Sequence, residues 1–240
     1  MALLEVTNVK KSFKGLTVFK DLSLNVNKGE IVGLIGPNGA GKTTLFNLIT
    51  GFHKPDQGSI TFEGQAITGL QPHLICKKGI VRTFQIVKPF PKLTIFKNIR
   101  IGAYKLVTDK KIAEQKANEV IRALDFEGEK HMLPSQLTIG GLKKLEFARA
   151  LATYPRLLLM DETMAGLNPT EQDAMIDMIK KINYAGITIF IIEHHMKVIM
   201  SLSHRVIVLN DERKIAEGTP QEVSRNEEVL KAYLGDSRAC

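Results

Sequence analysis

The sequence predicts an α/β fold with a mainly parallel sheet at its centre. Short segments that are almost wholly apolar, such as 31–35 and 157–160, alternate with amphipathic helical segments along the 240 residues. Such strands are typical of a sheet covered on both faces, and their alternation with helices favours parallel pairing. Near the N-terminus, 3–9 and 18–26 partly alternate apolar and polar residues, which indicates half-exposed strands. We therefore expect an antiparallel β layer ahead of the parallel core.

Each element of this fold follows from a local pattern. The expected strands cover residues 3–9, 18–26, 31–35, 59–64, 79–85, 157–160, 187–192 and 206–209. One helix is expected over 43–50, with Gly51 as its stop, and an amphipathic helix is expected over 170–182. Apolar residues on one face of the second helix predict core packing for Met175, Met178, Ile179 and Ile182.

The segment 88–135 has a different pattern from its surroundings. It contains Pro89 and Pro91, followed by charged stretches with helical spacing and without a convincing strand. We interpret it as a helical subdomain within a single domain of residues 1–240. The rest of that domain, 1–87 and 136–240, then forms the core with its antiparallel layer.

Composition excludes several classes of protein. Hydrophobic residues at 44% and charged residues at 24% are ordinary for a globular chain, so disorder, collagen and disulfide scaffolds are poor interpretations. The formal net charge of +8 suits an anionic partner without identifying it. The sequence lacks a secretory signal pattern, and none of its apolar runs reaches the roughly 18–20 residues that span a bilayer. We expect a soluble chain that reaches a membrane through a partner.

A glycine-rich string between the strand 31–35 and the helix 43–50 carries the strongest chemical signal. Gly36-Pro-Asn-Gly-Ala-Gly-Lys-Thr43 is a complete G-x-x-x-x-G-K-[ST] motif. Its backbone N–H groups and the helix start suit phosphate oxygens, the lysine suits the β- and γ-phosphates, and the threonine hydroxyl suits Mg²⁺. The residues expected to contact a nucleoside triphosphate here are Gly36, Pro37, Asn38, Gly39, Ala40, Gly41, Lys42, Thr43 and Thr44.

Two acidic residues end a later apolar strand, where a phosphate-binding loop needs its metal-side carboxylate. Leu157-Leu-Leu-Met-Asp161-Glu162 places Asp161 at the strand end and Glu162 one residue beyond. We expect Asp161 to act on the side of the metal and Glu162 to polarise the attacking water as a general base.

The segment Ser135 to Leu151, just before that strand, resembles the signature segment of ABC-transporter ATPase subunits. The resemblance covers essentially the whole chain. Gln85 in Arg-Thr-Phe-Gln is similar to the family's Q-loop, Asn168 in Ala-Gly-Leu-Asn to its D-loop, and His194 to its switch histidine. Phe13 occupies the place of the aromatic residue that stacks on adenine.

This resemblance implies the ABC-ATPase fold, ATP and Mg²⁺ as cofactors, and ATP hydrolysis as the activity. It implies two cassettes packed head to tail, with each ATP between the phosphate loop of one and the signature of the other. Thr138, Gly140, Gly141 and Asn168 then face the partner's nucleotide. The implied catalytic residues are Glu162, His194 and Gln85, and the implied metal contacts are Thr43, Gln85 and Asp161.

Three residues depart from the family's usual pattern. Thr138 replaces a serine, Gly141 replaces the signature glutamine, and Thr163 replaces a common proline after Asp-Glu. We expect the site on this chain's own phosphate loop to hydrolyse ATP and the site completed by its signature to be slower.

Features of the segments 79–85, 165–171 and 218–235 look like the subunits that drive uptake of branched-chain and other hydrophobic amino acids. The resemblance implies membrane-spanning permeases, a second ATPase subunit and, indirectly, an extracytoplasmic binding protein as partners. It implies a peripheral location at the cytoplasmic face of the membrane. In the helical subdomain, Phe90, Leu93 and Phe96 suit either contact with a cytoplasmic helix of a permease or packing in the core.

Two alternatives stay open at this point. A related group of ABC ATPase subunits, which drives lipopolysaccharide export, shares many of these sequence features. A soluble ABC-type ATPase acting on nucleic acid or ribosomes would suit the net charge of +8, but the fused cassettes, zinc-binding cysteine clusters and long coiled-coil insertions usual there are missing from the sequence. We therefore expect no nucleic-acid partner.

Overall fold

The computed structural model describes residues 1–84, 86–105 and 107–234 and contains two sheets. The larger sheet has the order β10-β9-β3-β8-β7-β6, and all neighbours pair in parallel except β9 and β10. Its strands are β3 (Ile31–Ile35), β6 (Ile80–Arg82), β7 (Leu157–Asp161), β8 (Thr188–Ile192), β9 (Arg205–Asn210) and β10 (Arg213–Gly218). The predicted α/β class and mainly parallel core are confirmed.

The smaller sheet is antiparallel, in the order β2-β1-β4-β5. It consists of β1 (Ala2–Phe13), β2 (Leu16–Asn27), β4 (Gln57–Phe62) and β5 (Gln65–Ala66). The first two strands are longer than the apolar alternation indicated, because irregularities in their pairing shift which residues face inward. The expected antiparallel layer is therefore present.

Another predicted strand is longer than the one in the structure. The strand expected over 79–85 begins at Ile80 and ends at Arg82. The Thr83 N–H still donates to the Leu159 carbonyl, but the N–H of Phe84 donates to the Glu146 carboxylate at 2.7 Å. A side chain from a distant helix thus ends the pairing, which local sequence patterning does not reveal.

The helix α1 (Lys42–Ile49) joins the two sheets through one apolar cluster. Leu45 and Phe46 are fully buried, and the Phe46 ring lies 5.3 Å from that of Phe190 in the parallel sheet. The same cluster includes Phe19 from the antiparallel sheet. The phosphate-loop region therefore has a rigid support on both sides.

The other face of the parallel sheet carries a second cluster, to which several helices contribute. Met175, Ile179 and Ile182 are buried there as predicted, whereas Met178 is partly buried and packs against the cluster. Among these helices are α3 (Ile95–Ala103), α4 (Lys110–Ala123), α5 (Ile139–Leu151), α6 (Pro169–Tyr184) and α7 (Met196–Leu202).

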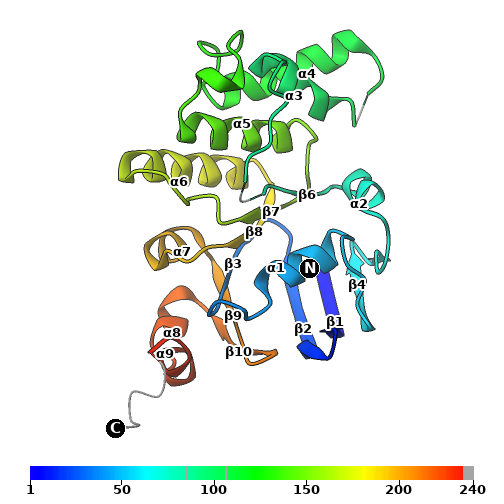
Figure 1. Cartoon of the computed structure of the whole chain (residues 1–240), viewed down its shortest axis with the longest axis vertical. Coiled ribbons are helices and arrows are strands. Elements are labelled where there is room, and N and C mark those ends of the chain that lie inside the picture. Colours follow the sequence, from blue (N-terminus) through cyan, green and yellow to red (C-terminus); the bar gives the residue numbers. More distant parts are fainter. Residues whose placement is uncertain (85, 106, 235–240) are drawn as a thin grey trace.

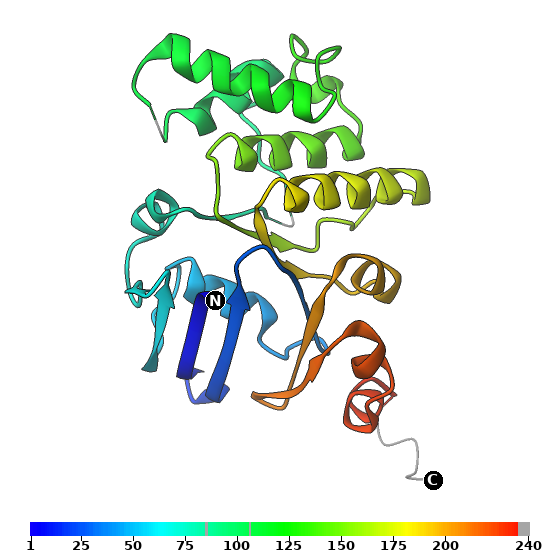
Figure 2. The ribbon, with the colours of Figure 1, turned by 180° about the vertical axis from the view of Figure 1, so that it is seen from behind.

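The helices α3 and α4 lie at one end of the molecule, and the C-terminal helices lie near the other (Figures 1 and 2). The latter are α8 (Pro220–Ser224) and α9 (Glu227–Leu234), and the remaining helical segments are α2 (Pro72–Lys78) and the short η1 (Pro134–Gln136). The helix α3 packs against both α4 and α5. Within the described ranges, no helix is long and apolar enough to cross a membrane.

Candidate active site

The loop between β3 and α1 has a backbone that requires glycine. Gly36 and Gly41 have φ angles of +152° and +91°. A Cβ on Gly36 would lie 2.2 Å from the Leu209 carbonyl oxygen, and one on Gly41 would lie 2.7 Å from the Phe19 ring. The loop is thus held tightly against β2 and β9, in a conformation that side chains would obstruct.

Lys42 folds back over this loop. Its ammonium group donates hydrogen bonds to the carbonyl oxygens of Gly36 at 2.7 Å and Pro37 at 2.9 Å. Burial lowers the pKa of Lys42, while the charges of Glu162 and Asp161 act in the opposite direction. The N-terminus of α1 therefore carries a buried cation. Its first residues, Lys42, Thr43 and Thr44, include no acidic side chain. This arrangement favours a phosphate.

A hollow of about 310 Å³ adjoins the loop. Asn38, Gly39 and Ala40 form one wall, and Leu16, Thr17 and Val18 at the start of β2 form another. Phe13 is not among the described residues that line it. The Phe13 ring instead lies 5.1 Å from the His53 ring, with the Lys11 ammonium 4.9 Å away.

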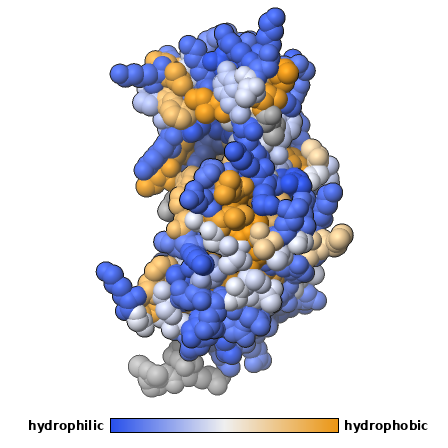
Figure 3. All heavy atoms as spheres, turned by 90° about the vertical axis from the view of Figure 1, so that its right-hand side faces the viewer, coloured by the Kyte–Doolittle hydropathy of each residue, from blue (hydrophilic) through white to orange (hydrophobic). Residues whose placement is uncertain are grey.

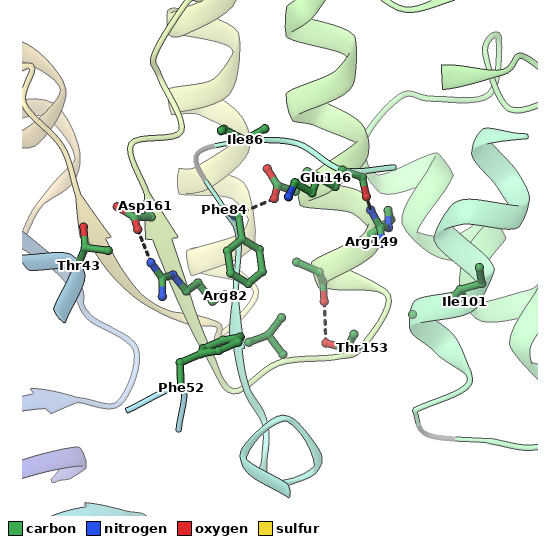
Figure 4. Close-up of a pocket in the computed structure, with 14 residues that line it drawn as sticks. Thr43, Phe52, Arg82, Phe84, Ile86, Ile101, Glu146, Arg149, Thr153 and Asp161 are labelled. Carbon is green, nitrogen blue, oxygen red and sulfur yellow. Dashed lines mark hydrogen bonds and ion pairs between the residues drawn. The ribbon is translucent and has the colours of Figure 1, made fainter. Parts of the chain in front are cut away.

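A larger hollow, of about 690 Å³, brings the threonine of the loop and the carboxylate of β7 together. In Figure 4, Thr43 and Asp161 lie on the same side of this pocket. Among the described residues, no group of three or more His, Cys, Asp or Glu side chains could hold a metal ion. A threonine hydroxyl with one carboxylate is nevertheless a donor set that fits Mg²⁺, since this ion is usually held by one or two carboxylates and substrate phosphates.

Asp161 has a partner that the sequence analysis missed. Its Oδ2 accepts a hydrogen bond from Arg82 Nη2 at 2.5 Å, and only 6% of the Arg82 side chain and 7% of the Asp161 side chain are exposed. The second nitrogen, Nη1, donates to Asn47 Oδ1 at 2.6 Å. The structure brings the two side chains together because the paired strands β6 and β7 end in Arg82 and Asp161.

Glu162 and His194, which the sequence analysis singled out separately, are in contact in the structure. His194 Nε2 lies 2.6 Å from Glu162 Oε1. The parallel pairing of β7 and β8 brings this about, because Asp161 is opposite Ile192 and the Glu162 N–H donates to the Ile192 carbonyl. Glu162 has a φ of +49°, which turns its side chain out of the strand direction. The pair places a carboxylate and an imidazole, two groups that serve in general acid–base chemistry, just beyond the ends of two adjacent strands.

Glu193, which precedes His194 in the chain, was not anticipated either. It is 2% exposed and accepts a hydrogen bond from the Met164 N–H at 2.9 Å. Burial raises the pKa of its carboxyl group. Thr163, one of the departures from the family pattern, is buried beside it with its hydroxyl 3.5 Å from Glu193 Oε1.

The structure places the signature residues outside both hollows. Thr138 caps α5 by accepting a hydrogen bond from the Gly141 N–H at 3.1 Å. Asn168 caps α6 in the same way, with Glu171 as its donor at 2.9 Å. A Cβ on Gly140 would lie 2.5 Å from Glu171 Oε1, so the two helix starts are in contact.

The predicted residue Gln85 lies outside the described residues, but the chain on both sides of it is held by α5. Glu146 accepts the Phe84 N–H, and Arg149 donates to the Lys88 carbonyl at 2.9 Å. Burial raises the pKa of Glu146, opposed by that hydrogen bond and by nearby cations. Neither side chain was singled out from the sequence, since both lie in an ordinary helical pattern.

Comparison with known proteins identifies the family of the chain. The model of the ABC transporter family matches residues 19–165, and the model described as branched-chain amino acid ATP-binding cassette transporter matches 213–239. The chain is 37% identical to the high-affinity branched-chain amino acid transport ATP-binding protein BraF of Pseudomonas aeruginosa, covering 98% of both chains. It is 34% identical to the lipopolysaccharide export system ATP-binding protein LptB of Haemophilus influenzae, again over 98% of both.

A solved structure shows the same fold. The crystal structure of the ADP conformation of an ATP-binding cassette from an ABC transporter aligns with a TM-score of 0.89 and 31% identity, covering 98% of this chain and 100% of the other. The resemblance to the ABC family and to its branched-chain amino-acid subfamily is thus confirmed. The chain belongs to the ABC transporter family, as an ATP-binding cassette with ATPase activity.

Proposed function

We propose that this chain powers the import of branched-chain or other hydrophobic amino acids through a membrane permease. The observation that carries the proposal is the match of residues 213–239 to the branched-chain cassette model, in addition to the general family match. The identity of 37% to BraF against 34% to LptB supports the same choice. The chain would then act at the cytoplasmic face of the membrane, with an extracytoplasmic binding protein as an indirect partner and no nucleic acid.

We infer that the residues around the phosphate loop hydrolyse ATP by positioning. Lys42 exchanges its two carbonyl acceptors for phosphate oxygens, which are stronger acceptors. Thr43, Asp161 and Gln85 would hold Mg²⁺, which supplies charge neutralisation when bound. Glu162 takes the proton of an in-line attacking water, and His194 lies beside the leaving γ-phosphate. Phe13 remains our proposal for the adenine contact.

A second cassette is required for a complete site in this proposal. The capped helix starts at Thr138 and Asn168 lie outside the hollows of their own chain, which supports a role toward a partner's nucleotide. Gly140 and Gly141 would bring bare backbone close to that γ-phosphate. Because Gly141 lacks the usual amide, we propose that the site completed by this signature is slower, and Gly141→Gln should raise its turnover.

The coupling surface is proposed at the larger hollow, between the core 1–87 and 136–240 and the helical subdomain 88–135. Phe84 and Ile86 are 45% and 70% exposed there. Of the residues expected to grip a permease helix, Phe90 is exposed, whereas Leu93 is half-buried and Phe96 packs against the core. Figure 3 shows apolar side chains exposed among hydrophilic ones on one face of the molecule.

The proposal is tested in cells that lack this chain. Wild-type protein should restore uptake of labelled leucine, isoleucine and valine, and Glu162→Gln should not. The wild-type protein, isolated in mild detergent, should carry very hydrophobic polypeptides with it. Unchanged amino-acid uptake in the deletion strain, or co-purification with stoichiometric RNA or DNA, would contradict the proposal, and a defect in lipopolysaccharide export would favour the alternative.

A further inference from the structure

Arg82 is a buried cation among the described residues that line the larger hollow, and its guanidinium group contacts Asp161. One nitrogen of its guanidinium group donates to Asp161 and another to Asn47, at 2.5 and 2.6 Å. The group also lies 5.6 Å from the Phe46 ring and 5.3 Å from the Phe84 ring. Because these contacts come from β7, α1 and the end of β6, the guanidinium group is fixed from several sides.

The position of Asn47 links this fork to the phosphate loop. Asn47 follows Thr43 by one helical turn of α1, so the two residues lie on the same face of the helix. In Figure 4, Asp161 lies between Arg82 and Thr43. Arg82 therefore ties the strand that carries the carboxylate to the helix face that carries the hydroxyl.

The burial of Arg82 has no explanation in packing alone. Its Nε is buried and has no hydrogen-bond partner among the described residues. Burial of an arginine side chain destabilises the fold unless an opposite charge compensates it, because removing an ion from water is costly. Asp161 supplies the compensating charge, and a fork of fixed N–H groups orients a carboxylate more strictly than a lysine could.

We propose that Arg82 is a positioning residue, which holds the Asp161 carboxylate in the orientation that serves Mg²⁺ beside Thr43. This inference rests on the proposed metal role of Asp161. Groups that orient a metal-side carboxylate without touching the ion typically change metal affinity or activity about 10–100-fold when they are removed. The affinity of the chain for a nucleotide should accordingly depend on Arg82 when Mg²⁺ is present and not when it is chelated.

The experiment measures the dissociation constant of ADP by titration calorimetry on the full chain, once with Mg²⁺ and once with EDTA. The ratio of the two constants gives the gain in affinity that Mg²⁺ provides. Arg82→Met should lower this gain about 10-fold and change the EDTA value by less than about 2-fold. Arg82→Lys and Asn47→Ala should lower the gain less, because each keeps part of the fork.

Two further variants separate the possible failures. Arg213→Met removes an arginine whose ion pair with Glu228 is exposed, and it should leave the gain unchanged. Asp161→Asn tests the proposed metal role itself. If Asp161→Asn leaves the gain unchanged, the metal assignment is wrong; if it lowers the gain and Arg82→Met does not, only the role of Arg82 is wrong.

Other outcomes also overturn the inference. A larger gain in Arg82→Met would mean that Arg82 competes with the metal, and an equal loss of affinity with and without Mg²⁺ would mean that it only supports the fold. Thermal unfolding without nucleotide identifies a variant that does not fold. If Arg82→Met does not fold, the test relies on Arg82→Lys and Asn47→Ala. An unchanged Mg²⁺-dependent gain in ADP affinity in both variants overturns the proposal.

Discussion

Around the phosphate loop, charged side chains reach from one element to another, whereas at the starts of α5 and α6 the polar side chains bond within their own helix. Arg82 joins β6 to β7 and α1, and Glu162 meets His194 between β7 and β8. Thr138 and Asn168 instead accept hydrogen bonds from backbone N–H groups in the first turns of α5 and α6. The contacts of the first region join separate elements of one chain. Among the residues that the structure describes, these polar side chains of the second region have their hydrogen-bond partners within their own helices and make no hydrogen bond to the phosphate-loop region. This difference supports a nucleotide site divided between two chains.

The largest effect expected in the first region comes from Glu162→Gln. Loss of the general base should lower ATP turnover about 10²- to 10⁴-fold, because proton transfer from the water then lacks its acceptor. Phosphate release by the assembled transporter measures this, and ATP affinity should remain near the wild-type value as the control. Unchanged turnover would remove Glu162 from the proposed chemistry.

Lys42→Ala should act on binding instead. Hydrogen bonds to charged groups contribute about 1.5–3 kcal/mol, so the affinity for ATP should fall roughly 10- to 100-fold. Equilibrium binding to the isolated chain measures this loss. Lys20→Ala removes a lysine that is exposed and ion-paired with Glu212, and it serves as the matched control. An ATP affinity that survives Lys42→Ala would contradict the loop as the main phosphate contact.

The second region is tested with Thr138→Ala. Removal of this helix cap should lower the free energy of unfolding by about 1 kcal/mol. ATP binding to the isolated chain should not change, while turnover of the assembled protein falls. Thr138→Ser keeps the hydroxyl and should restore both properties. A loss of ATP affinity in the monomer would place Thr138 in its own chain's site and remove the contrast between the regions.

Glu146 connects the two regions, and its effect should be the smallest. Its pKa is raised in the folded chain, so the stability associated with its protonated form is present below the unfolded pKa and is lost as pH rises through the folded pKa. Glu146→Gln should therefore flatten the decline of unfolding free energy with rising pH above about 4.5. Denaturant unfolding over that range measures it, with the exposed Glu5→Gln as control. If the unfolding free energy of Glu146→Gln falls with rising pH as steeply as that of the wild type, the Glu146 carboxyl is not the cause of this pH dependence.

Sequence patterns were most informative where a motif and a strand or helix coincide. The string from Gly36 to Thr43 and the strand end at Asp161 could be placed because an apolar strand precedes each. The strand β10 was missed, since Arg213–Gly218 has no strong apolar alternation and pairs because a turn returns it to β9. Arg82, Glu146 and Glu193 were missed because their partners are 29 or more residues away in the chain. Only the folded arrangement brings such pairs together.

The hold of α5 on the chain around position 85 has a mechanical consequence. Glu146 accepts a hydrogen bond from the Phe84 N–H, and Arg149 donates one to the Lys88 carbonyl. The Phe84 ring in turn packs against the Arg82 guanidinium. A tilt of α5 against the sheet would pull on this strip of backbone and, through the guanidinium, on the carboxylate of β7. A force applied to the helical end of the molecule would thus reach Asp161 through few contacts.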